Sequence, residues 1–230
     1  MNPIAIIPAR GGSKRLPRKN ILEVDGKPLL VHSINTALAS KIFHKVYVST
    51  EDEEIASIAD HAGAEVILRP YHLASDRASV KDVCLHLIDV VSAQYSFEHF
   101  CVMTATSILR DEKDIHSSYE LIQKGFDFVT SVCRYFFYPH AAIVVSSSGQ
   151  VAHQWPDVAL AKGQDLPEFV VENGSINWCK TDVFLEKQCF ISKNTAAYHM
   201  PKYKSIDVDT EEDFIALKAM YFYLKNQVQF

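Results

Sequence analysis

The sequence predicts an α/β domain with a mostly parallel sheet and helices on both faces. Short apolar runs alternate with helical patterns along most of the 230 residues, as expected of repeated β-α-β units. The first run, residues 3–8 (PIAIIP), is continuously apolar, which is typical of a strand buried on both faces of a sheet. In such folds ligands bind beyond the carboxyl ends of the strands, so the residues that follow each strand are candidates for a site.

The remaining elements continue this alternation. Residues 29–39 predict a helix, because apolar residues recur at helical spacing and Pro28 suits a first helical turn. A second helix over 51–62 begins with carboxylates that suit the positive end of its dipole, and Gly63 ends it. The same patterns predict strands over 45–50, 64–68, 100–106 and 126–132, and helices over 78–93 and 111–124.

The alternation stops between about residues 134 and 178. Short extended pieces with a turn at 148–149 predict an inserted region of β-hairpins and loops rather than a second domain. Residues 205–209 (SIDVD) then predict a strand that leads into a long amphipathic helix. Thr210 and Asp213 fit a capping box at the start of this helix, with Asp in the Glu role. The whole chain is expected to form one domain.

The composition excludes several classes of protein. Hydrophobic residues at 48% and charged residues at 22% are ordinary for a globular protein and exclude disordered and fibrous chains. The net charge of −5 provides no overall basic field for nucleic acid. Five cysteines without C-x-x-C spacing argue against a disulfide framework or a structural zinc site. No stretch resembles a signal peptide or a membrane span, so we expect a cytoplasmic protein without nucleic-acid or membrane partners.

A basic loop follows the first predicted strand. Residues 9–20 (ARGGSKRLPRKN) carry two glycines, a serine and five cations within an acidic chain. Glycines allow backbone N–H groups to turn inward around an anion, and the cations could neutralise a triphosphate. The spacing matches neither G-x-x-x-x-G-K-[ST] nor G-x-G-x-x-G. The alternative is a solvated basic loop in which the glycines serve only the turn.

Two carboxylates near the end of the chain form the second candidate cluster. Asp207 and Asp209 are two apart on the predicted strand, so both point to the same side at its carboxyl end. Mg²⁺ suits them, with Mn²⁺ as a substitute, because it is usually held by one or two carboxylates together with phosphates and water. Alternatively, Asp209 caps the final helix and Asp207 is solvated.

These segments together resemble the acylneuraminate cytidylyltransferase family, the CMP-sialic acid synthetase-like enzymes that activate acidic nine-carbon sugars, including legionaminic and pseudaminic types. IIPARGGSKRLPRKN, GKPLL, VSTEDEEIA, RPYHLASD, QDLPEFVVENGSI and SIDVDTEEDF occur in the family's order over almost the whole chain. The ending Lys19-Asn20 favours this branch over relatives that act on octulosonates. The resemblance implies a Rossmann-like, nucleotide-diphospho-sugar transferase-like fold, CTP and Mg²⁺, and a homodimer to which residues 134–178 contribute.

The resemblance also implies roles for individual residues. Lys19, near the reacting α-phosphate, and Arg10 are expected to be catalytic, and Asp207 and Asp209 match the family's D-x-D-T phrase. An ordinary surface loop with a helix N-cap at Ser75 or Asp76 is the alternative for the segment that reads cytosine. The expected nucleotide-binding residues are Arg10, Gly11, Gly12, Ser13, Lys14, Lys19, Asn20, Arg69, His72, Ala78 and Ser79.

The sugar side matches the family less well. Thr104 stands where a glutamine is expected, Asn177 replaces an aromatic residue, and the GQDLP segment replaces RQ-x-LP. Arg110 is a candidate carboxylate clamp, with a helix-start or phosphate-side role as the alternative. The expected sugar-side residues are Thr104, Ser107, Arg110, Gln164, Asn177 and Phe190.

The sequence therefore predicts a Mg²⁺-dependent transfer of CMP from CTP to the C2 hydroxyl of a nonulosonic acid, with release of pyrophosphate. Such transfers depend mainly on positioning and on charge offset at the phosphates. Two alternatives remain open. One is the same reaction on a 3-deoxy-octulosonate-type acid, and the other is a nucleotide-binding homologue without catalysis.

Overall fold

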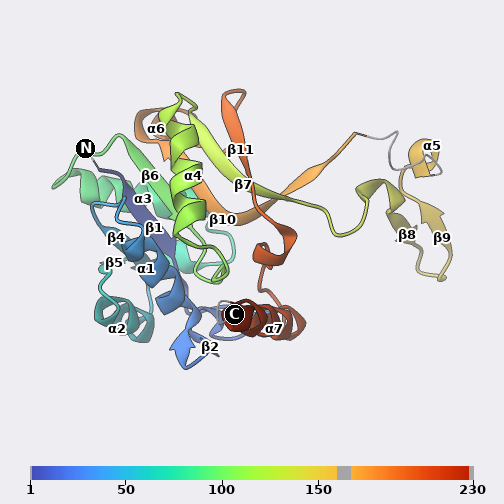
Figure 1. The fold of residues 1–230 in the computed structure, drawn as a ribbon, viewed down its shortest axis with the longest axis horizontal. Helices are drawn as coiled ribbons and strands as arrows, with labels where there is room; N and C mark the ends of the chain where they lie inside the picture. The colour runs from blue at the N-terminus through green and yellow to red at the C-terminus, as the bar shows by residue number, and fades with distance from the viewer. Residues whose placement is uncertain (1, 160–166, 228–230) are drawn as a thin grey trace.

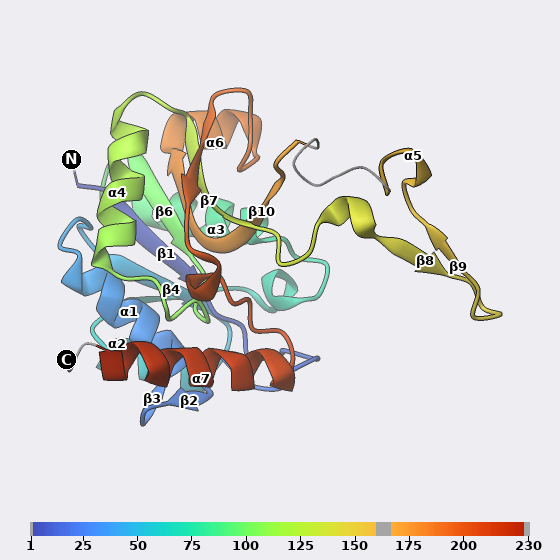
Figure 2. The ribbon, with the colours of Figure 1, turned by 45° about the vertical axis from the view of Figure 1, so that its right-hand side comes forward.

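The computed structural model describes residues 2–159 and 167–227. A seven-stranded sheet with the order β11-β7-β10-β6-β1-β4-β5 forms its centre (Figures 1 and 2). Six of these strands run in one direction, and β10 is antiparallel to both of its neighbours. The predicted mostly parallel, Rossmann-like sheet is confirmed. The strands are β1 (Ile4–Pro8), β4 (Val46–Thr50), β5 (Glu65–Leu68), β6 (His99–Met103), β7 (Phe128–Arg134), β10 (Val170–Lys180) and β11 (Thr195–His199).

Helices cover both faces of this sheet, as predicted. One face packs against α1 (Leu29–Ala39), α2 (Glu53–His61) and α4 (Glu112–Gln123). The other face packs against α3 (Val80–Ser92) and α6 (Thr181–Lys187). The sheet is therefore the middle layer of three.

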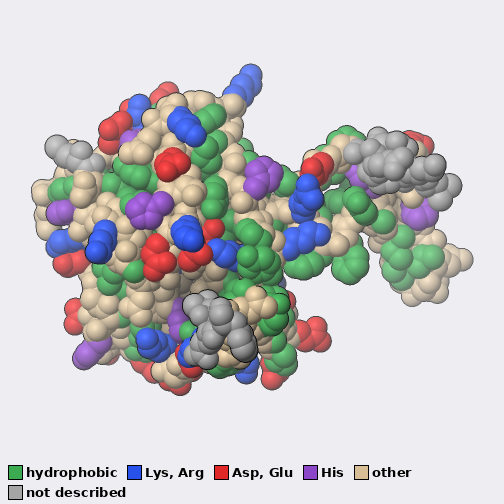
Figure 3. All heavy atoms as spheres, viewed as in Figure 1, with side chains coloured by type: hydrophobic (Ala, Val, Ile, Leu, Met, Phe, Trp, Pro, Cys, Tyr) green, Lys and Arg blue, Asp and Glu red, His purple; other side chains and the backbone are tan. Residues whose placement is uncertain are grey.

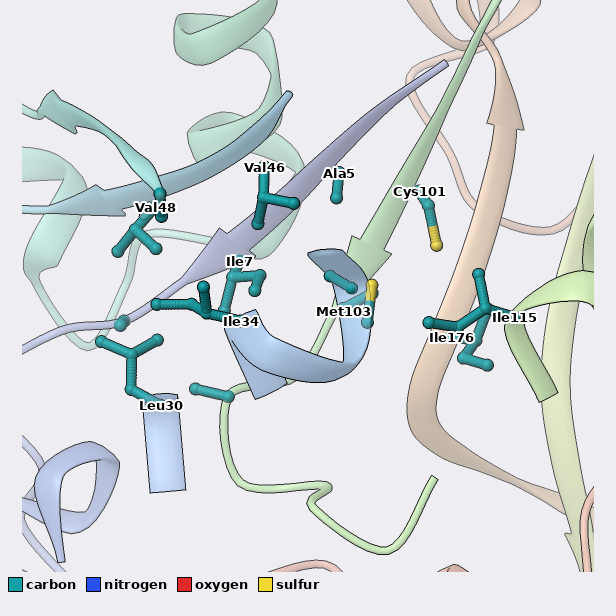
Figure 4. Close-up of a cluster of buried hydrophobic side chains, with 14 of the residues drawn as sticks. Ala5, Ile7, Leu30, Ile34, Val46, Val48, Cys101, Met103, Ile115 and Ile176 are labelled. Atoms are coloured by element: carbon teal, nitrogen blue, oxygen red, sulfur yellow. The ribbon is translucent and has the colours of Figure 1, made fainter. Parts of the chain in front are cut away.

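Successive residues of a central strand enter opposite layers of the core. Ala5 and Ile7 of β1 join a cluster that includes Ile34 of α1 (Figure 4). Ile4 and Ile6 join the cluster on the α3 side. All four strand residues are fully buried, because side chains alternate across a strand and both faces of this sheet are covered. This explains the continuous apolar run in the sequence.

The last helix, α7 (Glu211–Gln227), packs across the carboxyl edge of the sheet. Leu217 of α7 contributes to a third cluster with Leu29 and Val208. The predicted capping box is confirmed: the Asp213 carboxylate accepts the Thr210 N–H at 2.8 Å, and the Thr210 hydroxyl accepts the Asp213 N–H at 3.3 Å. A short hairpin of β2 (Glu23–Val24) and β3 (Lys27–Pro28) lies beside α7.

The predicted strand over 205–209 is wrong. This segment is irregular and follows a short 3₁₀ turn at Lys202–Lys204, whereas the seventh strand of the sheet is β11. Helix α6 and β11 were not predicted. Strand β11 pairs with β7 along its whole length, and that partner cannot be read from local periodicity.

The inserted region is shorter than predicted. Strands β8 (Ile143–Val145) and β9 (Val151–His153) form a hairpin that, with α5 (Pro156–Ala159), extends away from the sheet (Figure 2). Residues 170–178, assigned to the insertion from the sequence, belong to β10 in the centre of the sheet. We call the described residues 135–159 and 167–169 the arm.

Two expectations from composition can be compared with the structure. All five cysteines are free and four of them are buried. Burial raises the pKa of the Cys84 and Cys101 thiols, so neither is poised as a nucleophile. Across residues 2–159 and 167–227 we find no helix with both the length and the hydrophobicity that crossing a bilayer requires.

The buried hydrogen bond between β10 and α4 provides a stability test. Trp178 is fully buried, and its Nε1–H donates to the Ser118 hydroxyl at 2.9 Å. We expect Ser118→Ala to lower the free energy of unfolding by about 1–3 kcal/mol, because the indole N–H loses its partner inside the core. Urea denaturation measures this loss. The matched control is Ser57→Ala on the exposed side of α2, which makes the same change of helix propensity and should leave the unfolding free energy nearly unchanged.

Candidate active site

The loops after the parallel strands meet at one edge of the sheet and line a cleft of about 360 Å³. The basic loop after β1, the segment after β5, the end of β6 and the segment after β11 all contribute to it. Because the six strands run in one direction, their carboxyl ends lie at the same edge. The cleft residues named from the sequence are Arg10, Ser13, Lys19, Asn20, Arg69, Ala78, Ser79, Thr104 and Asp209.

Lys19 and Asp209 meet in this cleft although they are 190 positions apart. The Lys19 ammonium donates to Asp209 Oδ1 at 2.9 Å and to the Val208 carbonyl at 2.9 Å. Arg15 Nη2 lies 2.7 Å from the other carboxylate oxygen, Oδ2 of Asp209. The basic loop and the C-terminal acids therefore share one side of the molecule, as the sequence predicts.

Asp207 lies beside Asp209 without such a partner. Its carboxyl group is accessible to solvent, and no hydrogen bond joins it to residues 2–159 or 167–227. Partial desolvation by nearby protein atoms, followed by repulsion from Asp209, raises the pKa of Asp207. Negative charge is thus in excess at Asp207 and offset at Asp209.

The donor chemistry of these two carboxylates fits a hard cation. Among the described residues, no group of three or more His, Cys, Asp or Glu side chains could enclose a metal ion. A cation at Asp207 and Asp209 would need its other ligands from phosphate oxygens and water, which is the usual situation of Mg²⁺.

Ion pairs also cross the mouth of the cleft. Arg10 Nη1 lies 3.1 Å from Asp76 Oδ1, and Lys14 Nζ lies 2.5 Å from Asp76 Oδ2. The Lys14 ammonium and then Arg10 hold the pKa of Asp76 below its usual range. Asn20 is buried and donates to the Arg10 carbonyl at 2.9 Å, which fixes the course of the loop. The cations of the loop are thus paired with protein carboxylates.

The two glycines of the loop lie outside the cleft, and the Gly11 N–H is already bonded, so it is not available for the anion cradle predicted from the sequence. The Gly11 N–H donates to Glu51 Oε1 at 2.8 Å, and Gly11 and Gly12 line a neighbouring acidic depression instead of the cleft. A Cβ at Gly11 would clash with the Asp52 carboxylate, which is held as the N-cap of α2 and by its pair with Arg18, so close approach explains this glycine. Ser13 does line the cleft, and its buried hydroxyl has no partner among the described residues, which leaves it free for an anion.

The segment over 69–79 lines the cleft with Arg69, Leu73, Ser75, Asp76, Ala78 and Ser79. The buried Arg69 side chain donates to Glu51 Oε2 from Nε at 3.1 Å and from Nη2 at 2.8 Å. Ser79 is the N-cap of α3 and completes a capping box with Asp82, so the N-cap suggested at residues 75–76 is wrong. His72 is exposed on the 3₁₀ turn Tyr71–Ala74 and does not line the cleft.

Two predicted sugar-side residues support the loop after β6. Thr104 lines the cleft, and its hydroxyl donates to the Gly174 carbonyl. Arg110 is only 2% exposed; it donates to the Ser175 carbonyl at 2.9 Å and to the Thr104 carbonyl at 3.1 Å. Burial lowers the pKa of Arg110 to about 10. The predicted carboxylate clamp is therefore corrected: Arg110 fastens this loop to β10.

The other predicted sugar-side residues are scattered. Ser107 is buried in the same loop. Asn177 pairs in register with Val102 and accepts the Thr130 hydroxyl at 2.7 Å. Phe190 packs on Phe184 at the edge where the parallel strands begin, opposite the cleft, and its assignment to the site is corrected accordingly. Gln164 lies outside the described residues.

Sequence reasoning missed Glu51 and Lys204. Glu51 joins the basic loop to the segment over 69–79, as described above. Lys204 Nζ lies 2.7 Å from Asp111 Oδ2 and 2.8 Å from Asp114 Oδ2, and the Tyr198 hydroxyl donates to Asp114 at 2.9 Å. Lys204 thereby ties the segment that carries Asp207 and Asp209 to the start of α4. The acidic first turn of α4 was visible in the sequence, but its partner was not.

Comparisons with known proteins identify the family and the fold of the chain. The family model described as "Cytidylyltransferase" matches residues 4–152. The chain is 31% identical over 224 residues to a pseudaminic acid cytidylyltransferase of Campylobacter jejuni, covering 96% of this chain and 97% of that protein. It is 34% identical to an N-acylneuraminate cytidylyltransferase of Streptococcus agalactiae, covering 97% of this chain but 54% of that longer protein. A solved CMP:2-keto-3-deoxy-manno-octonic acid synthetase complexed with CTP has a TM-score of 0.73 and 18% identity, covering 97% of this chain and 99% of that one, and shows the same fold.

The contacts of Lys204 lead to a prediction about stability. We expect Lys204→Met to lower the free energy of unfolding by about 2–4 kcal/mol at neutral pH, because it leaves the buried Asp114 carboxylate without its cation. Although partial burial opposes it, the hydrogen bond from Lys204 holds the pKa of Asp111 below its ordinary value of 3.8. The stabilisation that the ionised Asp111 gains from Lys204 is complete above the ordinary pKa of 3.8. It is lost as the pH falls through the lower pKa that Asp111 has in the folded protein. Urea titrations at pH 7 and pH 3 should show a smaller difference between the two proteins in acid.

The control for this prediction is Lys187→Met, which removes a similar pair with Asp127 at 3.0 Å on the surface. Exposed pairs contribute little, so this variant should unfold almost like the wild type. A Lys204→Met protein with wild-type stability at pH 7 would contradict the assigned anchoring contact.

Proposed function

Because the chain belongs to the cytidylyltransferase family, we propose that it transfers CMP from CTP to a nonulosonic acid of the pseudaminic type and releases pyrophosphate. The observation that carries this proposal is the contact of Lys19 with Asp209 inside a cleft at the carboxyl edge of the sheet. A protein that only binds nucleotide has no need of paired carboxylates beside its phosphate cations. The likeness to the Campylobacter enzyme over nearly the full length of both proteins supports the acceptor class.

In the proposed reaction the C2 hydroxyl of the 2-keto acid attacks the α-phosphorus of CTP. A new bond to the sugar oxygen forms, the bond to the bridging oxygen breaks, and pyrophosphate leaves with the electron pair. Lys19 is already held by Asp209 and the Val208 carbonyl, so its charge needs little reorganisation as negative charge develops on the phosphate. In this proposal Arg10 and Lys14 exchange their pairs with Asp76 for the distal phosphates.

We propose that Asp207 and Asp209 hold a magnesium ion, or manganese in its place. When bound, the ion would offset negative charge on the phosphate oxygens. The repulsion between Asp207 and Asp209 that contributes to the raised pKa of Asp207 supports this assignment, since a divalent cation relieves it. The C2 hydroxyl gives its proton to water as the new bond to phosphorus forms.

We further propose that two copies associate through the arm. Apolar side chains gather on the arm and where it meets the body (Figure 3), and a two-stranded hairpin of this size cannot bury its own apolar groups. Phe137 is 87% exposed. The other large hydrophobic side chains of the arm that remain exposed are Tyr135, Phe136, Tyr138, Ile143, Val144, Val145, Val151, Trp155 and Phe169.

Turnover with a panel of acids tests the proposed reaction. We expect pyrophosphate release from CTP and Mg²⁺ with pseudaminic or legionaminic acid, and a product with the mass of the CMP-sugar. Lys19→Met should lower kcat/KM by about 10²–10³, because it removes a fixed cation from the reacting phosphate. Lys45→Met, at the opposite edge of the sheet, should retain wild-type turnover. If pyrophosphate were released only with 3-deoxy-octulosonates, the acceptor would be of that class instead. If no acid caused pyrophosphate release, the protein would be a nucleotide-binding homologue without catalysis.

The arm gives a prediction about association. We expect the wild type to sediment as a dimer and Phe137→Asp as a monomer, because the charge would be buried in the proposed interface. The control is Ile191→Asp, which places the same charge at a half-exposed apolar position of the body and should remain dimeric. Equal sedimentation of wild type and Phe137→Asp would refute the role of the arm.

A further inference from the structure

Both oxygens of the Asp209 carboxylate are occupied by cations of the chain itself. Lys19 Nζ takes Oδ1 at 2.9 Å, and Arg15 Nη2 takes Oδ2 at 2.7 Å. Arg15 and Asp209 also line the same cleft. A metal ion at Asp209 therefore has to compete with a side chain that is already in place.

The two cations are not equally fixed. The Lys19 side chain is 23% exposed and has a second anchor in the Val208 carbonyl. The Arg15 side chain is 70% exposed, and Asp209 is its ion-pair partner in the structure. Exposed pairs of this kind contribute little free energy and exchange easily. Arg15 is the cation that can leave.

The local charge explains why its departure matters. Asp207, Asp209, Lys19 and Arg15 sum to no net charge, so this corner of the cleft has little attraction for a free divalent cation. A triphosphate changes the balance, because a guanidinium binds phosphate oxygens through two parallel hydrogen bonds and prefers them to a single carboxylate contact.

We propose that Arg15 is a latch on Asp209 that keeps metal from the carboxylate pair until a nucleoside triphosphate draws the guanidinium away. Metal then binds together with the nucleotide rather than before it. Arg15 thus has two opposite effects: it weakens metal binding to the free protein and strengthens binding of the metal–nucleotide complex. This inference rests on the proposed function, because it assigns the triphosphate and the metal to this cleft.

Mn²⁺ binding, followed by electron paramagnetic resonance of the free ion, tests the latch without turnover. In the absence of nucleotide we expect Arg15→Ala to bind Mn²⁺ about three- to tenfold more tightly than the wild type. The same variant should bind Mn²⁺–CTP several-fold more weakly. Arg15→Lys, which retains the charge, should stay close to the wild type in the first titration. Since Arg15 is mostly exposed, thermal unfolding should confirm that both variants are folded.

Two further variants locate the effect. Lys45→Ala removes a comparable exposed pair, Lys45 with Glu65 at 2.7 Å, at the far edge of the sheet, and should not change Mn²⁺ binding. The gain of Arg15→Ala should disappear in a background of Asp209→Asn, because the latch acts through that carboxylate.

Opposite signs in the two titrations are the decisive result. A purely structural role of Arg15 would weaken both kinds of binding, and that outcome would overturn the latch, as would unchanged Mn²⁺ binding in Arg15→Ala. Both titrations are read without a sugar acid, so an inactive sugar side cannot imitate either result. If no sugar acid of the panel caused pyrophosphate release, that result would contradict the proposed reaction but not the proposed role of Arg15.

Discussion

The ion pair between Lys19 and Asp209 is the contact around which the cleft is arranged. It requires that residue 19, just after the first strand, and residue 209, just before the last helix, arrive at the same edge of one sheet. Parallel strands meet that requirement because each of them ends at this edge. Val208 adds a second constraint: it is fully buried beside Leu29 and Leu217, and it fixes the backbone so that an acid stands on each side of it.

Much of the fold could be predicted from the sequence, because burial on both faces leaves a local signal. The continuous apolar run of β1 and the helical period of residues 29–39 show it clearly, and the strand and helix followed as predicted. Strand β10 escaped prediction for a physical reason. Its middle, Glu172 to Gly174, is polar and irregular, and it is held by partners such as the Ser131 hydroxyl, which donates to Asn173 at 2.5 Å. Such partners are distant in the sequence.

The candidate site could be predicted in its charges but not in its pairings. Two glycines and five cations after a buried strand are visible without a structure, and so are two neighbouring aspartates. The sequence does not show whether an arginine binds a ligand or another part of the protein, because the same N–H donors can do either. Arg110 illustrates the limit: it was expected at a substrate carboxylate, and backbone carbonyls occupy it instead. Glu51 was hidden among the neighbouring acids just before and at the start of α2, yet it alone among them contacts Arg69.

The pairs of the cleft fall into two groups that differ in burial and therefore in function. The Glu51–Arg69 pair has side chains that are 9% and 3% exposed, and breaking such a pair costs about 3–5 kcal/mol, so it belongs to the permanent frame of the loops. The pairs of Arg10 and Lys14 with Asp76, and of Arg15 with Asp209, lie in contact with water, where ion pairs contribute little. An arriving triphosphate can exchange the second group without disturbing the first. The frame therefore keeps its shape while the exposed cations exchange protein carboxylates for the oxygens of a phosphate chain.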